Sequence, residues 1–162
     1  MAMDVASFEL ALEEAIGPAH RLACGMVHDP QAAEDLVQEA AVKAWRKRHQ
    51  LRPGAPLRPW FLGIVANECR AHFRLRWTSV LKRAELAVES SSGDLDALAD
   101  LRRELLRLGA DDRLVIVLHV HLDMSLEDVA AVMGKSLSAV RGRFYRAIRK
   151  LRIRLELQEA VR

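Results

Sequence analysis

The sequence is poor in the residues that build disulfide frameworks, β-sheets and membrane spans. It has 2 cysteines, too few for a fold stapled by disulfides. Strand formers are scarce, with 5% aromatic residues and a single threonine, Thr78. No apolar run is long enough to cross a membrane. The segment Met1–Glu14 is acidic and lacks a basic-then-apolar signal, so we expect a cytoplasmic protein without membrane insertion.

Enzyme motifs are also missing. The chain has no glycine-rich phosphate loop, no nucleophile elbow and no obvious pair of carboxylates in a cleft. Two pairs at helical spacing, Cys24 with His28 and Cys69 with His72, could together bind zinc. Cys69, however, falls on an apolar stripe, where a lone cysteine is commonly a small core residue. We therefore expect neither an enzyme nor a metal site, and no cofactor.

Charge is abundant and unevenly distributed. The formal net charge of +3 hides two basic blocks around an acidic one. Residues 40–83 contain 11 Lys/Arg and one acidic residue. Residues 84–112 contain 3 Lys/Arg and 8 acidic residues, and residues 113–162 contain 10 Lys/Arg and 5 acidic residues. This pattern indicates two modules that contact a polyanion, joined by a segment that does not.

Apolar residues recur at helical spacing along nearly the whole chain, which predicts an all-α protein. Asp29-Pro30 is a strong helix start, residues 52–56 form a loop, and residues 89–94 are the best linker candidate. The division that follows is an N-terminal helical module to about Arg83, an acidic flexible linker, and a C-terminal helical module from about Asp94. Helices are expected at Val5–Ala15, Pro18–Val27, Pro30–Gln50, Pro59–Trp77, Asp94–Leu108, Asp111–Leu122, Leu126–Met133 and Leu137–Leu157.

The segment Ser125–Leu155 has the layout of a helix-turn-helix DNA reader. Ser125 can cap a short helix, with Asp128 placed to reach back to the cap, and Gly134 suits the left-handed turn that ends it. Ser136 then caps a second helix, which is basic and contains no acid before Glu156. A solvated helix packed on a neighbour is the alternative, but such helices usually mix both signs of charge. One-signed charge after a short turn favours nucleic acid.

Two N-terminal helices carry candidate binding faces. On the helix Pro30–Gln50 a polar face with one apolar residue suits either ordinary solvent exposure or docking of a protein. On the helix Pro59–Trp77 a small residue, an amide, two guanidinium groups and an aromatic ring form a line that suits a nucleic-acid strand. Packing against another helix, with Gly63 at the crossing, is the alternative for this second line. The two faces comprise Asp35, Gln38, Glu39, Val42, Arg46 and His49, and Gly63, Asn67, Arg70, Arg74 and Trp77.

The chain resembles the extracytoplasmic-function group of bacterial RNA polymerase sigma factors, in the sigma-70 family. Members keep two helical domains, called regions 2 and 4. The resemblance rests on the order and spacing of several short motifs across most of the chain. They are Ala33–Glu39, Ala44–Arg46, Arg58–Leu62, Ile64–Asn67, Leu126–Ala130, Gly134, Ser136, Val140–Arg141 and Arg146–Ala147.

The resemblance implies a region 2 domain at 1–83, a linker at 84–104 and a region 4 domain with the helix-turn-helix at 105–162. It also implies an alternative sigma factor that binds core RNA polymerase, recognises and opens a promoter, and is controlled by an anti-sigma factor. Asp35, Gln38, Glu39, Val42 and Arg46 would bind the clamp helices of the largest polymerase subunit. The −10 element would be bound by Trp60, Asn67, Arg70, Arg74 and Trp77, and the −35 element by Ser136, Ser138, Arg141, Gly142, Arg143, Tyr145 and Arg146.

The chain departs from the family pattern at three places, and two other functions stay open. Ala71 stands where many members have Asp, Gly109-Ala110-Asp111 replaces a proline-rich turn, and Gly142 replaces a common Ser. A helix-turn-helix regulator that binds DNA alone would need a dimer-matched site. A sigma mimic that only captures an anti-sigma factor would not need the basic face of the last helix.

Overall fold

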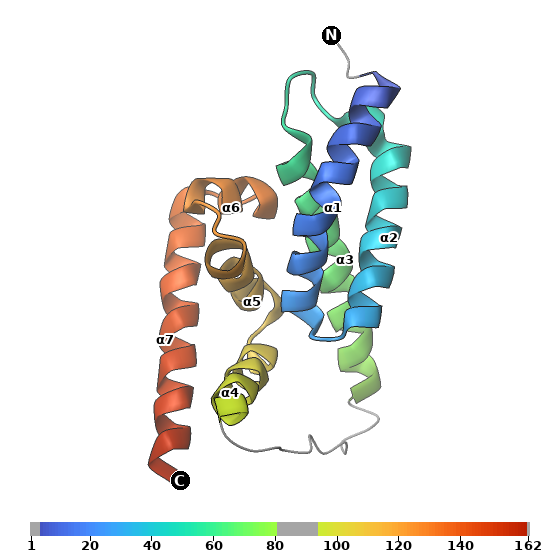
Figure 1. Ribbon diagram of the computed structural model, residues 1–162. Helices are drawn as coiled ribbons and strands as arrows, with labels where there is room; N and C mark the ends of the chain where they lie inside the picture. The colour runs from blue at the N-terminus through green and yellow to red at the C-terminus, as the bar shows by residue number, and fades with distance from the viewer. Residues whose placement is uncertain (1–3, 81–93, 162) are drawn as a thin grey trace.

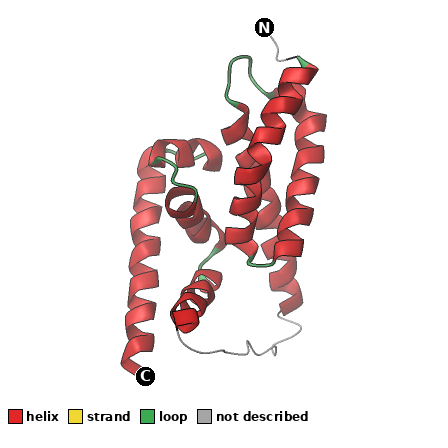
Figure 2. Ribbon diagram, viewed as in Figure 1, coloured by secondary structure: helices red, strands yellow, loops and turns green. Residues whose placement is uncertain are grey.

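The computed structural model describes residues 4–80 and 94–161, and within them the chain is helical with no strand (Figure 2). The predicted all-α class is confirmed. The helices are α1 (Val5–Val27), α2 (Pro30–Lys47), the 3₁₀ turn η1 (Arg48–Gln50), α3 (Leu57–Val80), α4 (Asp94–Arg107), α5 (Ala110–Ile116), the π-helical turn η2 (Val117–His121), α6 (Leu126–Met133) and α7 (Leu137–Val161). No described helix combines the length and apolar character needed to cross a membrane.

Helices α1, α2 and α3 pack side by side as an N-terminal bundle (Figure 1). The Asp29 carboxylate accepts hydrogen bonds from the amides of Gln31 and Ala32, both at 3.1 Å, and Pro30 occupies the first helical position of α2, as predicted. The core between the three helices is apolar and fully buried. It includes Phe8, Leu22, Met26, Phe61, Leu62 and Val65.

The first helix differs from its prediction. Two helices, Val5–Ala15 and Pro18–Val27, were predicted, whereas α1 is a single helix that runs through Pro18 without interruption. Proline removes one backbone hydrogen bond, yet Ala15 and Ala19 on either side of it are buried in the same bundle. Burial of one continuous apolar stripe therefore outweighs the local cost of the proline.

Helices α4, α5, α6 and α7 form a C-terminal bundle, in which α6, a tight turn and α7 have the predicted helix-turn-helix order (Figure 1). The Ser125 hydroxyl accepts from the Asp128 amide at 3.0 Å, and Gly134 has a left-handed φ of 62°. Asp128 accepts a bond from the Ser125 hydroxyl at 2.8 Å rather than from the cap amide that the sequence suggested. Ser136 caps α7 by accepting from the Ala139 amide at 3.2 Å.

The predicted linker is only partly within the structure. Residues 81–93, including the three consecutive serines, lie outside the described residues. Residues 94–104 belong to α4, whose Asp100 and Glu104 are buried in the C-terminal bundle. The boundaries 1–83, 84–104 and 105–162 therefore stay a prediction, although α4 packs against α7 in the C-terminal bundle.

The two bundles lie against each other. Helix α6 packs on α3, and η2 packs on α1, so the first half of the helix-turn-helix contacts the N-terminal bundle (Figure 1). The π-helical turn inserts one extra residue into the helix that begins with α5, which buries Val117 and Leu118 and leaves Val120 exposed.

Candidate protein and nucleic-acid interfaces

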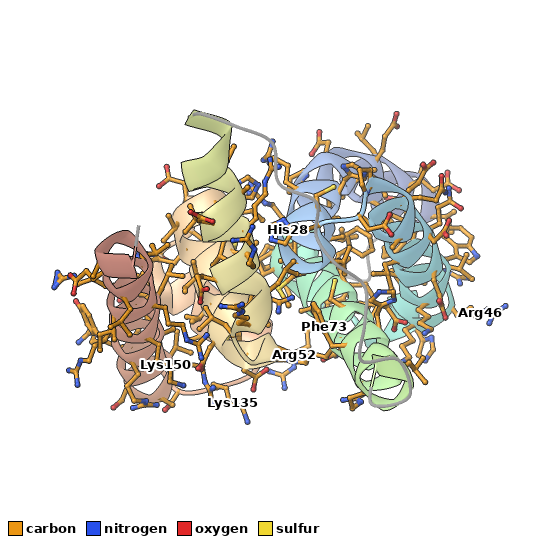
Figure 3. All side chains as sticks on the ribbon, turned by 90° about the horizontal axis from the view of Figure 1, so that it is seen from below. His28, Arg46, Arg52, Phe73, Lys135 and Lys150 are labelled. Atoms are coloured by element: carbon orange, nitrogen blue, oxygen red, sulfur yellow. The ribbon has the colours of Figure 1, made fainter. Side chains whose placement is uncertain are left out.

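The outer face of α2 is an exposed surface with mixed chemistry. All five predicted docking residues, Asp35, Gln38, Glu39, Val42 and Arg46, are exposed, and Val42 keeps 49% of its surface. Their neighbours Leu36, Val37, Ala40 and Ala44 are buried, so the predicted division of α2 into two faces is confirmed for these residues. Figure 3 places Arg46 at the edge of the molecule away from the C-terminal bundle.

Helical spacing places Trp45 in one apolar stripe with Leu36, Val37, Ala40, Ala41 and Ala44, which predicts a core position, and this prediction is wrong. Its side chain lies at the rim, 36% exposed, with its ring edge-on to Phe8 at 6.0 Å. The Arg48 guanidinium covers the ring at 4.5 Å from its centre. The bundle is filled at this end by Phe8, so the larger indole is left at the surface.

The line predicted on α3 is only partly available to a nucleic acid. Asn67 is exposed and accepts a bond from Arg70 Nη1 at 3.0 Å, so the structure brings these two residues together. Arg70 Nε also donates to Asp111 Oδ1 of α5 at 2.7 Å. Arg74 is exposed, whereas the side chain of Trp77 lies outside the described part of the chain.

Two further residues of this region are engaged in packing. Trp60 is half-buried, with its ring edge-on to Phe8 at 6.4 Å. A Cβ added at Gly63 would lie 3.2 Å from the carbonyl oxygen of Val132 in α6. Gly63 therefore stands at a helix crossing, as the alternative interpretation of this line required.

The first turns of α7 present a basic, solvent-facing surface. Ser136, Ser138, Arg141, Tyr145 and Arg146 are exposed, and Tyr145 keeps 60% of its surface. The apolar side chains Val140, Ala147 and Leu151 face the bundle. This places the polar face where a recognition helix would contact base edges and phosphates.

Two predicted residues on α7 are constrained by their neighbours. Arg143 Nη1 donates to Asp112 Oδ1 at 2.8 Å, and Lys150 Nζ donates to the other oxygen of the same carboxylate at 2.8 Å. Although burial alone would raise it, these hydrogen bonds hold the pKa of Asp112 below its ordinary value. A Cβ on Gly142 would lie 3.2 Å from Nη1 of Arg146, so the missing side chain leaves room for that guanidinium.

A buried cation that no sequence pattern indicated lies at the junction of the two bundles. Arg113 of α5 is 2% exposed and donates to the carbonyl of Met26 at 2.7 Å and to that of Leu105 at 2.7 Å. It also donates to the carbonyls of Leu106 and Leu108. These carbonyls lie at the C-terminal ends of α1 and α4, where the helix dipoles favour a positive charge.

The face of Phe73 completes the surroundings of Arg113, with its ring centre 4.2 Å from the guanidinium carbon. Burial lowers the pKa of Arg113 to about 10, so the group stays protonated at neutral pH. The only sequence feature that points to this role is weak: Arg113 directly precedes the apolar run Leu114–Leu118.

The cysteine and histidine pairs do not assemble into one site. Burial raises the pKa of Cys69 to about 12 and also raises that of Cys24, which disfavours the thiolates that bind metals. Among the described residues, no group of three or more His, Cys, Asp and Glu side chains is placed to hold a metal ion.

Comparison with known proteins identifies both modules. Residues 13–78 match the family model for sigma-70 region 2, and residues 98–151 match the model for sigma-70 region 4. The RNA polymerase sigma factor CarQ of Myxococcus xanthus is 33% identical over 133 residues, which cover 78% of this chain and 76% of CarQ.

Solved structures agree over nearly the whole chain. The sigma factor RpoE of Bartonella quintana, crystallised with the anti-sigma factor NepR, gives a TM-score of 0.73 at 30% identity, covering 94% of this chain and 98% of RpoE. CnrH, in complex with the cytosolic domain of CnrY, gives a TM-score of 0.72 at 28% identity, covering 95% of this chain and 90% of CnrH. The chain belongs to the extracytoplasmic-function group of the sigma-70 family of RNA polymerase sigma factors.

Proposed function

We propose that this chain is an alternative sigma factor, which binds core RNA polymerase, recognises the −10 and −35 elements of a promoter and starts transcription. The observation that carries the proposal is the joint presence of the exposed α2 face and the acid-free, solvent-facing start of α7 in a member of this family. The chain's role is that of an initiation factor rather than a catalyst, because the polymerase supplies the chemistry.

The α7 surface supports contact with the −35 element. Capping by Ser136 fixes the start of the helix, and Arg141, Tyr145 and Arg146 then lie on its exposed side. The N-terminal residues of a recognition helix contact base edges in the major groove, while arginines further along hold phosphates. Arg143 supports this surface through Asp112 rather than facing solvent freely.

The α2 surface supports docking on the polymerase clamp helices. Exposed carboxylates and an amide surround the apolar Val42, which is the composition of a small protein interface with a polar rim. The principal helix contacts of α2 are with α1, α3 and η1, so the C-terminal bundle does not cover this face.

We also infer regulation by an anti-sigma factor. RpoE of Bartonella quintana is bound to the anti-sigma factor NepR, CnrH is bound to the cytosolic domain of CnrY, and each aligns with 94% or more of this chain, both bundles included. The arrangement of the two bundles in this chain is therefore similar to the arrangement found in those complexes.

A run-off transcription assay tests the function directly, with purified core polymerase and promoter DNA from upstream of the protein's own gene. We expect a discrete transcript that requires the chain. Failure to bind core polymerase would refute the proposal, and tight binding of duplex DNA by the chain alone would favour a stand-alone regulator.

The docking face is tested by the double substitution Gln38→Ala with Glu39→Ala. Because both side chains are exposed, the fold should stay intact while affinity for core polymerase falls by about tenfold or more. Glu13→Ala with Glu14→Ala, which removes exposed acids from α1, is the matched control. Unchanged affinity of the first pair, measured by fluorescence anisotropy, would exclude this face.

The −35 contact is tested by Arg146→Ala. If Arg146 reads a base, promoter affinity should fall by about 1–3 kcal/mol, and the loss should disappear on a scrambled −35 element. Arg152→Ala is the control, since residue 152 is exposed and lies about 9 Å further along the helix. An equal loss on both promoters would make Arg146 a phosphate contact.

A further inference from the structure

A cavity of about 480 Å³ lies between the C-terminal end of α1 on one side and α4, η2 and α7 on the other. None of the described residues proposed to bind polymerase or DNA lines it. Cavities of about 300–1,000 Å³ with mostly apolar walls and a few polar groups are the usual form of a small-molecule site. Most of the side chains that line this cavity are apolar, and they include Leu98, Leu101, Leu105, Val117, Val120 and Ile148.

The polar side chains around the cavity are basic, apart from the thiol of Cys24. They are His28, Arg102 and His121, and no carboxylate belongs to the described residues of the lining. Figure 3 shows His28 between the two bundles. Asp29, the next residue along the chain, lines a smaller neighbouring cavity, but its carboxylate accepts the first amides of α2. The apolar walls therefore end at a rim of basic groups without an acid to offset them.

Arg102 is the permanently charged group of this rim, and it lacks the partner that its neighbours on α4 have. Arg103 Nη1 donates to Asp100 at 2.7 Å, and Arg107 Nη1 donates to Glu104 at 2.6 Å. Arg102 is exposed and forms no ion pair with any residue that the structure describes. A guanidinium presents a planar pair of donors that matches the two oxygens of a carboxylate. Arg102 can therefore accept an anionic group at the mouth of the cavity.

His28 adds an unsatisfied polar atom to the same rim. Its Nε2 is buried and has no hydrogen-bond partner in the described part of the chain. Burial lowers the pKa of His28, and the nearby charges of Arg113, Arg102 and His121 lower it further. A negative charge beside Arg102 would offset these positive charges, and its oxygens would supply the acceptor that this side of the cavity lacks.

From the cavity and its rim we infer a binding site for a free fatty acid of medium chain length. The alkyl chain fills the apolar cavity, and the carboxylate pairs with Arg102 beside His28. A single guanidinium matches the single charge of a carboxylate, and the apolar lining matches a hydrocarbon chain. The site goes beyond the proposed function, because binding of the acid requires neither polymerase nor DNA.

Isothermal titration calorimetry of the full chain with sodium decanoate tests the site. We expect one molecule to bind per chain, with a Kd below about 100 µM. Decylammonium has the same chain with a positive charge, and acetate has the carboxylate without the chain. Each should bind at least about tenfold more weakly than decanoate. Absence of saturable decanoate binding would overturn the proposal, as would equal affinity for either of the other two probes.

Two substitutions at the rim locate the bound carboxylate. Arg102→Gln removes the exposed cation, and Val120→Glu places a carboxylate at a side chain that keeps 60% of its surface, so neither change disturbs the core. Each should raise the Kd for decanoate by about tenfold or more, because a hydrogen bond to a charged group is lost or a like charge is added.

Matched controls make the same chemical changes on α1, away from the cavity lining. They are Arg21→Gln, at an exposed arginine, and Leu10→Glu, at a side chain that keeps 61% of its surface. Both should bind decanoate like the native chain, and far-ultraviolet circular dichroism checks that all four variants are folded. Native affinity in Arg102→Gln and Val120→Glu would place decanoate elsewhere and overturn the site.

Discussion

Replacement of the buried Arg113 by methionine should strongly destabilise the protein. The guanidinium donates to four backbone carbonyls, those of Met26, Leu105, Leu106 and Leu108. A buried acceptor that loses its partner costs about 1–3 kcal/mol. Water would reach some of these carbonyls, and methionine restores apolar contact, so we expect a net loss of about 3–5 kcal/mol.

That loss is a large part of the total stability, because the free energy of unfolding of a single domain is about 5–15 kcal/mol. Urea denaturation followed by circular dichroism at 222 nm measures it. Arg149→Met, which replaces an exposed arginine on α7, should stay within about 0.5 kcal/mol of the native protein. A cost below about 1 kcal/mol for Arg113→Met would show that its hydrogen bonds contribute little.

Two further substitutions follow from the structure. Gly142→Ala should raise the free energy of unfolding by about 0.5–1 kcal/mol in urea denaturation, because glycine is unfavourable inside a helix. The two atoms within 4 Å of the added Cβ, Nη1 and Cζ, both belong to the flexible end of Arg146. A loss of stability would mean that Arg146 cannot move. Burial lowers the pKa of His28, and the nearby charges of Arg113, Arg102 and His121 lower it further. As the pH falls, the unfolded chain therefore takes up the proton before the folded chain does. The free energy of unfolding should then decrease as the pH drops below about 6.5. His28→Asn, which suits the left-handed φ of 52°, should flatten that dependence in urea denaturation at pH 7.5 and 5.5, and an unchanged slope would assign it elsewhere.

Local structure could largely be predicted from the sequence because short-range signals decided it. Asp29-Pro30 begins α2, and Ser125 and Gly134 bound α6, since each satisfies backbone groups that a helix end leaves unpaired. The proline in α1 was misleading because burial on both sides of Pro18 keeps the helix continuous.

Contacts between the bundles could not be predicted in the same way. An arginine at position 70 is equally suited to bind DNA or Asp111, and nothing in the spacing of the sequence distinguishes these two partners. Gly63 was predicted to belong to a line of residues on α3 that faces a nucleic-acid strand, yet it lies where α3 crosses α6. Such features depend on residues distant in the sequence, so a local pattern indicates the chemistry of a surface but not its occupant.

The Arg70–Asp111 pair has a consequence for how the chain competes for chromosomal DNA. If Arg70 and α7 contact DNA as proposed, the chain with this pair formed would keep only the α7 contact and would be monovalent for DNA. Two linked binding sites can exceed the affinity of either one by about 10²–10⁴-fold, so a monovalent chain dissociates readily from the many non-specific sites of a genome. Bivalent binding would then become available only at the polymerase, where the two bundles can be held apart at the spacing of a promoter.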